Sequence, residues 1–498
     1  MSFNSLHFLW FFPAVVLVYF ILPKRIRYIW LLIASYYFYM CWSAKYALLL
    51  LFSTAVTYAF GLLMDACDRR GLRKDKADRL KKLCVVASLV LNLGVLIYFK
   101  YTNFALGALQ RAFDAVHITL AVPKVDVLLP VGISFYIFQA LSYTIDLYRR
   151  EISVEKNFLR YALFVSFFPQ LVAGPIERSK NLLSQLKEPK DFSFERFLNG
   201  LLLMLWGYFV KIVLADRISV FVDAVYADPV AYGGYYIAVA SILFAFQIYC
   251  DFCGYSVIAA GAAEILGVKL MDNFNAPYLA LSVSDFWTRW HISLSSWFRD
   301  YLYFPLGGSR KGKARTCLNK MIVFTLSGLW HGAQFSYVVW GMLNGLYQVI
   351  SDLLKPVRDR AVRIFHIDRR SFCHRLVCMA GTFLLVDFAL IFFRAEKLTA
   401  ALQLIGQMFS VRNPWILFDG SLYALGLDRP NFTVMLLGIA LLQFADAQKL
   451  RGVVIRERIM AQAAWFRVLF FAFSIFLLLL FGIYGTKYIA ANFIYFQF

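Results

Sequence analysis

The chain has 498 residues, of which 61% are hydrophobic and 18% aromatic, and its mean hydropathy is +0.64. This composition excludes a soluble enzyme and indicates a polytopic α-helical membrane protein. The net charge of +21 would suggest nucleic-acid binding in a soluble protein, but in a membrane protein it is typical of basic cytoplasmic loops.

Apolar segments recur along the whole chain, and most are long enough for one bilayer crossing. The run at 6–22 lacks a preceding basic region, so we expect it to stay as the first span. We predict about twelve crossings with both termini outside, because this arrangement puts most of the 51 lysines and arginines inside. The segments are 6–22, 28–42, 46–64, 83–99, 128–147, 159–176, 197–215, 235–268, 318–333, 335–353, 376–393, 431–446 and 468–486.

The segment 159–176 is the exception, because two prolines and a glycine interrupt it at Phe168–Pro175. Broken backbone at membrane depth is tolerated only where protein or a water-filled cavity covers it. We therefore predict a re-entrant element here that packs near a cavity. No repeat or low-complexity linker divides the chain, which favours one membrane domain over 1–498.

The region 275–304 alternates aromatic and charged residues, as in Phe286-Trp287-Thr288-Arg289-Trp290-His291. This pattern predicts a helix that lies at the inner interface or plugs the base of a cavity. His291 is either an ordinary interfacial histidine or a polar group at the cytoplasmic end of a passage.

His331 follows a short apolar run, and the next segment begins almost at once at Phe335. This spacing places the histidine on a buried turn between two helices. An ionisable group at membrane depth suggests function, and burial favours the neutral imidazole that can accept a proton. The alternative is a histidine that only bonds to a neighbouring carbonyl.

Three other features leave two readings open. The glycine-rich basic loop 307–313, with Arg310 and Lys311, either binds phosphate groups or is an ordinary cytoplasmic loop. The charged residues within apolar segments either line a cavity or form structural pairs, and Cys250 and Cys253 have no second ligand pair, so we expect no metal site. The aromatic terminus 493–498 is either an interfacial anchor or a functional tail.

Three motifs together resemble those of the membrane-bound O-acyltransferases, and within them the bacterial branch of alginate O-acetyltransferase membrane subunits and D-alanyl transfer proteins. They lie at 167–175, 284–295 and 328–332, within a motif core at about 130–350. The resemblance implies an all-α polytopic membrane protein, with a ring of about twelve helices plus re-entrant and interfacial helices around a central tunnel.

The resemblance also implies site residues. His331 matches the catalytic histidine and His291 the second histidine on the donor side, with Trp290, Trp330, Arg289, Arg310 and Lys311 as candidate donor-binding residues. The tail resembles one whose tyrosine is proposed to accept the acyl group, which makes Tyr495 a candidate extracytoplasmic acyl relay.

The expected function is O-acetylation of a cell-envelope or secreted polysaccharide by an enzyme of the bacterial cell membrane. Acetyl-CoA, or a thioester on an acyl carrier protein, is the expected donor substrate, without a bound cofactor. An extracytoplasmic SGNH-type acetyltransferase is the expected partner. The alternatives are D-alanyl transfer to teichoic acid and a polysaccharide or ion transporter, although a transporter should show paired broken helices in two matching halves.

Overall fold

The computed structural model describes residues 1–69, 73–118, 125 and 129–484. Within these residues the structure is helical and contains no strand. Seven helices in this part of the chain are long and apolar enough to cross a membrane, and Leu6–Ile21 is a shorter apolar helix. The predicted multi-pass helical protein is confirmed, whereas the number of about twelve crossings stays a prediction.

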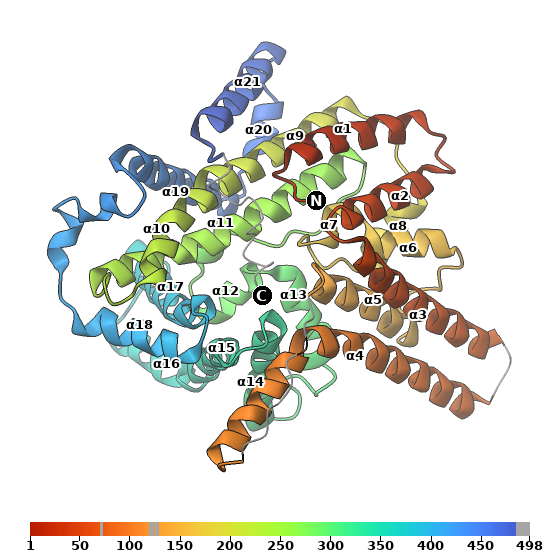
Figure 1. Ribbon diagram of the computed structural model, residues 1–498, viewed down its shortest axis with the longest axis horizontal. Helices are drawn as coiled ribbons and strands as arrows, with labels where there is room; N and C mark the ends of the chain where they lie inside the picture. The colour runs from red at the N-terminus through yellow and green to blue at the C-terminus, as the bar shows by residue number, and fades with distance from the viewer. Residues whose placement is uncertain (70–72, 119–124, 126–128, 485–498) are drawn as a thin grey trace. The chain divides into compact units, whose positions relative to one another are not determined.

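The described helices form two compact units that alternate along the chain. Unit 1 comprises 1–204 and 258–271, and unit 2 comprises 205–257 and 272–498. The expected single membrane domain stays a prediction. The helices of unit 1 are α1 Leu6–Ile21, α2 Arg27–Met40, α3 Ala44–Arg69, α4 Lys74–Ala115, α5 Ile133–Tyr148, α6 Phe158–Ser166, α7 Phe168–Leu171, α8 Ser179–Lys187 and most of α9 Phe194–Tyr208 (Figure 1).

The interrupted segment of unit 1 is broken where its sequence predicts, because α6 ends at Ser166 and the short α7 begins at Phe168. Glutamine side chains satisfy its backbone: Gln139 on α5 and Gln170 on α7 both donate to the carbonyl of Phe164, at 2.6 and 3.2 Å. The two amides also bond to each other at 2.8 Å. Protein therefore covers the broken backbone, which is the condition for such an element inside a membrane.

Unit 2 begins with a π-helix and contains the two segments that carry the histidines of interest. Its elements are η1 Phe209–Ala215, α10 Asp216–Ala227, most of α11 Tyr235–Ile265, η2 Pro277–Leu279, α12 Val283–Arg289, α13 Ile292–Phe298, η3 Arg299–Tyr303, α14 Lys313–His331, α15 Phe335–Leu353, α16 Lys355–Ile364, α17 Phe372–Arg394, α18 Leu398–Ser410, η4 Pro414–Leu417, η5 Ser421–Ala424, α19 Arg429–Leu450, α20 Ile455–Met460 and α21 Ala464–Phe481.

Helices α14 and α15 pack closely as an antiparallel pair (Figure 1). Glycine makes the close approach possible: a methyl group at Gly328 would clash with the carbonyl of Tyr337, and one at Gly341 with the carbonyl of Phe324. Small residues at such positions let helix backbones approach within a membrane. This packing fixes the end of α14, where His331 lies.

Two of the charged residues within the apolar segments, Lys211 and Asp251, belong to one structural cluster. Lys211 on η1 lies 2.8 Å from Asp216 and 2.5 Å from Asp251, and all three side chains are largely shielded from solvent. An unpaired buried charge is costly, so this ion pairing stabilises the fold. For Lys211 and Asp251 it favours a structural pair over residues that line a cavity.

Candidate active site

His331 is the last residue of α14, and the chain turns through 332–334 before α15 begins. Its side chain is 4% exposed, as expected for a buried turn. The ring contacts Trp340 on α15 and Phe393 on α17, with centroids 5.1 and 5.2 Å away and the ring planes steeply inclined. The imidazole is thus enclosed by aromatic side chains from two neighbouring helices.

His291 lies in the turn between α12 and α13 and is fully buried. Of the two arrangements predicted for this amphipathic region, the burial of His291 favours the plug, in which tertiary packing folds the region inward. The backbone of His291 is left-handed, with φ 43° and ψ 53°, which is uncommon for a residue with a side chain. Its ring meets the edge of Phe252 on α11 at a centroid distance of 4.6 Å.

The two histidines are neighbours in space. Their ring centroids lie 6.4 Å apart, and the ring of Trp330 lies 6.0 Å from His291 and 4.9 Å from His331. That His291 lies at the cytoplasmic rim and His331 deeper stays a prediction, and the structure adds that both rings belong to one cluster. A single small substrate group can therefore contact both.

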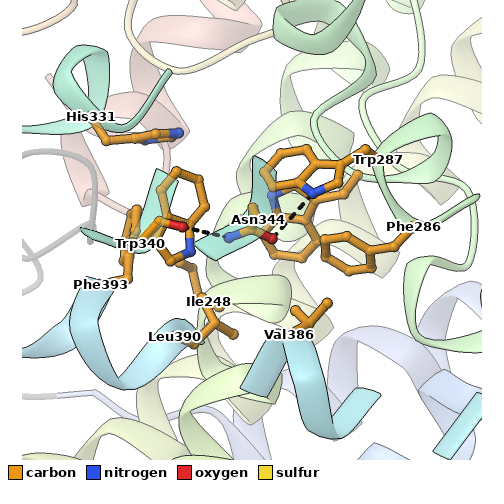
Figure 2. A pocket seen from close by; sticks show the side chains of 10 residues that line it. Ile248, Phe286, Trp287, His331, Trp340, Asn344, Val386, Leu390 and Phe393 are labelled. Carbon is orange, nitrogen blue, oxygen red and sulfur yellow. Dashed lines mark hydrogen bonds between the residues drawn. The ribbon is translucent and has the colours of Figure 1, made fainter. Parts of the chain in front are cut away.

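A narrow pocket opens beside His331, with room for about one water molecule (Figure 2). Its walls come from α11, α12, α14, α15 and α17, and they are apolar apart from His331 and Asn344. The lining residues are Ile248, Phe286, Trp287, Trp290, His331, Trp340, Asn344, Val386, Leu390 and Phe393. An aromatic pocket with few polar groups is typical of sites for small apolar groups.

Asn344 fixes the distance between two walls of this pocket. Figure 2 shows its amide between Trp287 and Trp340: Oδ1 accepts a bond from the indole of Trp287 at 3.2 Å, and Nδ2 donates to the carbonyl of Trp340 at 2.9 Å. Because the amide is buried, both bonds hold the indole of α12 against α15.

The electrostatics of the cluster favour neutral imidazole at His291. This residue lies outside the candidate membrane spans, and burial lowers its pKa from the ordinary value of 6.5 to about 3. At neutral pH its ring therefore carries one donor and one acceptor nitrogen. Such a ring can bond to a carbonyl or a hydroxyl without introducing charge into the cluster.

Of the other candidate donor-binding residues, some lie at the pocket and some do not. Trp290 lines the pocket and stacks on Phe286 at 5.4 Å, whereas Arg289 pairs with Asp285 within α12 at 2.7 Å. Arg310 and Lys311 are exposed on the glycine-rich loop and do not line the pocket.

The backbone of that loop is shaped by glycine. Gly307, Gly308 and Gly312 have φ of 104°, 56° and 87°, and buried Asn319 on α14 donates to the carbonyl of Gly308 at 2.9 Å. The backbone of the loop is therefore hydrogen-bonded to the N-terminal part of α14, while its basic side chains face solvent.

A protein similar to this chain over most of its length is the probable alginate O-acetylase of Pseudomonas putida. The two are 36% identical over 416 residues, which cover 82% of this chain and 80% of that protein. The family model described as MBOAT, membrane-bound O-acyltransferase family, matches residues 146–363. This chain belongs to the membrane-bound O-acyltransferase family. The matched range contains both clustered histidines, and the protein is an O-acyltransferase.

Other membrane-bound O-acyltransferase relatives extend the comparison. The peptidoglycan O-acetyltransferase of Helicobacter pylori is 32% identical over 429 residues, covering 80% of this chain and 77% of that protein. The teichoic acid D-alanyltransferase of Bacillus subtilis is 26% identical over 231 residues, covering 43% of this chain and 57% of that protein. Similarity to the O-acetyltransferases is thus both higher and more extensive.

Sequence reasoning therefore found part of this O-acyltransferase site. Tyr495 and the terminus 493–498 lie outside the described residues, so their role stays a prediction. Asn344, Trp340 and Phe393 were missed, and only Asn344 had a usable signal: an amide between Gly341 and Gly345 in an apolar segment. The other two are aromatic residues in a chain with many, so only folding distinguishes them.

Proposed function

We propose that this O-acyltransferase transfers an acetyl group from acetyl-CoA across the bacterial cell membrane to a cell-envelope or secreted polysaccharide. One observation carries the proposal: two buried histidines have rings 6.4 Å apart, and one of them, His331, lines a narrow aromatic pocket. The names of the alginate and peptidoglycan O-acetyltransferases support acetyl as the group and a polysaccharide as the acceptor.

In this mechanism the acetyl thioester enters from the cytoplasm and its small acyl group occupies the pocket beside His331. His331 takes the proton of the attacking hydroxyl, whose oxygen forms a bond to the acyl carbon. The carbon–sulfur bond then breaks, and the CoA thiolate receives a proton. The neutral ring of His291 donates a hydrogen bond to the carbonyl oxygen on which negative charge develops.

The enclosed aromatic walls support this chemistry. They exclude bulk water, which would otherwise hydrolyse the thioester, and they strengthen hydrogen bonds within the cluster. Arg310 and Lys311, on the exposed loop before α14, would bind the phosphates of CoA at the cytoplasmic entrance. Trp330, whose ring lies beside both histidine rings, would hold both in place.

Beyond the site, we propose that both termini face outward and that Tyr495 accepts the acetyl group before a separate SGNH-type acetyltransferase passes it to the polysaccharide. Support comes from the distribution of basic residues and the tail motif. The D-alanyl alternative fits less well, because its relative matches a smaller part of the chain at lower identity.

The test is the acetyl content of polysaccharide purified from cells that express variants of the full chain. We expect His331→Ala to reduce acetylation by about 10²–10⁴-fold, the range for loss of a general base. His374→Ala, near the start of α17, is the matched control and should retain wild-type acetylation. Normal acetylation by His331→Ala would contradict the mechanism.

The relay is tested separately with Tyr495→Phe, which removes only the phenolic oxygen. We expect polysaccharide acetylation to be lost while purified membranes still bind acetyl-CoA, because the donor site stays intact and only the acceptor hydroxyl is gone. If Tyr495→Phe acetylates polysaccharide normally, the relay is wrong and the remaining mechanism stands.

A further inference from the structure

The turn that carries His291 is held by a buried polar cluster outside the ring contacts described above. Asn273, only 3% exposed, accepts a hydrogen bond from the backbone N–H of Ile292 through its carbonyl, at 3.0 Å. Its side-chain Oδ1 accepts two bonds from Ser293, one from Oγ at 2.6 Å and one from the backbone N–H at 3.3 Å. One residue thus binds both positions that directly follow His291.

The same segment also binds the chain before His291. The backbone N–H of Asn275 donates to the carbonyl of Arg289 at 2.9 Å. Residues 273–275 therefore run beside the turn and fasten it on both sides. Hydrogen bonds on both sides are what a strained backbone needs, because a left-handed residue with a side chain persists only when its surroundings impose that conformation.

Helix α11 supports the backbone and the ring of this turn from one face. Nδ2 of Asn273 donates to the hydroxyl of Ser256 at 3.1 Å, and the ring of Phe252 contacts His291. Ser256 and Phe252 are four residues apart, so they lie on the same face of the helix. Helix α11 therefore fixes the position of the imidazole through two contacts, the hydrogen bond of Ser256 with Asn273 and the ring contact of Phe252 with His291.

We propose that Asn273 is a positioning residue for acyl transfer, which holds His291 in its left-handed conformation and so sets the imidazole beside His331. This inference rests on the proposed function, because it takes the histidine pair as the site of transfer. The hydrogen bonds described for Asn273 are with the backbone of Ile292, with Ser293 and with Ser256, so it acts through the position of His291.

The experiment measures transfer of label from acetyl-CoA to the polysaccharide fraction by membranes that contain the full chain, per amount of folded protein. We expect Asn273→Ala to reduce the rate roughly 10- to 100-fold, since a misplacement of about 1 Å can cost this much. Asn275→Ala is the matched control, because its bond to Arg289 comes from the backbone, and its rate should stay within about twofold of wild type.

A double-mutant cycle separates positioning from a general structural role. In a His291→Gln background, Asn273→Ala should change the rate by less than about twofold, because the group that it positions is already gone. An equal fold-loss in both backgrounds would overturn the proposal. Failure of the proposed function would be seen separately, as activity retained by His331→Ala, and does not depend on the fold-losses compared in this cycle.

Conservative variants decide the question without relying on the His291 background. Asn273→Asp keeps the acceptor for Ser293, and the hydroxyl of Ser256 can donate to the new carboxylate, so we expect a rate within about threefold of wild type. Ser293→Ala removes a single hydroxyl and keeps the backbone bonds, which guards against misfolding, and should lose about three- to tenfold. Asn273→Asp as impaired as Asn273→Ala, or an unaffected Ser293→Ala, would contradict the positioning role.

Discussion

Each unit contains one buried stretch of irregular backbone whose polar groups need hydrogen-bond partners, and the two units supply those partners from different residues. In unit 1 the amides of Gln139 and Gln170 satisfy the backbone at the break between α6 and α7, and Glu177 follows in the irregular chain after α7. In unit 2 the turn between α12 and α13 is satisfied by Asn273, while the aromatic rings surround His291. In the first stretch the described polar bonds satisfy the backbone, whereas the second also places the titratable ring of His291 beside that of His331.

The difference shows how a helical membrane protein separates scaffold from site. Amide side chains are neutral at every physiological pH, so a segment fastened by them is insensitive to protonation. A buried histidine or carboxyl group makes its segment sensitive to pH, in opposite directions because one group is a base and the other an acid. Four predictions would break or sharpen this comparison.

The largest expected effect is the acid sensitivity of His291. Its folded pKa of about 3 lies below the ordinary 6.5, so below pH 6.5 the unfolded chain binds a proton that the folded chain rejects. Stability should therefore fall by up to about 1.4 kcal/mol per pH unit from pH 6.5 towards 3. Thermal unfolding of the detergent-solubilised protein should show a smaller decline in His291→Phe than in wild type, and identical slopes would refute the assignment.

Glu177 should give the opposite pH dependence. Burial raises its pKa from 4.5 to about 7, against the hydrogen bonds from the N–H of Met271 at 2.5 Å and from Asn181 at 2.7 Å. The folded chain therefore holds a proton that the unfolded chain has lost, and stability should fall as pH rises from 4.5 to 7. Glu177→Gln should flatten this decline in the same unfolding assay, with the exposed Glu188→Gln as control. If the stability of Glu177→Gln still declines between pH 4.5 and 7 as in wild type, Glu177 is not the group responsible.

A smaller effect is expected at the break in unit 1. Gln170→Leu removes one of the two donors to the carbonyl of Phe164 and leaves the amide of Gln139 with one partner fewer, which should cost about 1–3 kcal/mol. Unfolding in denaturant measures this loss, and the transfer rate per folded molecule should stay near wild type. A rate loss well beyond the loss of folded protein would place this segment within the active machinery.

The smallest effect is expected at the pocket wall. Asn344→Leu removes the bond to the indole of Trp287 while keeping the side-chain size, at a cost of about 0.5–1.5 kcal/mol. We expect kcat/KM for acetyl-CoA to fall by up to about tenfold, and Trp287→Phe to behave similarly because it removes the other half of the bond. Clearly unequal effects would show that one residue acts independently of the bond.

The sequence by itself determined the helical membrane class, the break at Phe168–Pro175 and the buried turn at His331. Each depends on local properties: apolar length, the inability of proline to continue a helix, and the short distance between successive segments. Both histidines could be selected from the sequence because ionisable residues are costly in apolar surroundings.

Only the tertiary structure decided that His291 is buried, that its ring lies 6.4 Å from that of His331, and that Asn273 and Asn344 fasten the site. An amphipathic stretch has the same pattern whether its apolar face meets lipid or protein, so its sequence cannot choose between an interfacial helix and a plug. The long-range contacts of α11, α12 and α15 make that choice, because they supply the partners that compensate the strained backbone and the buried amides.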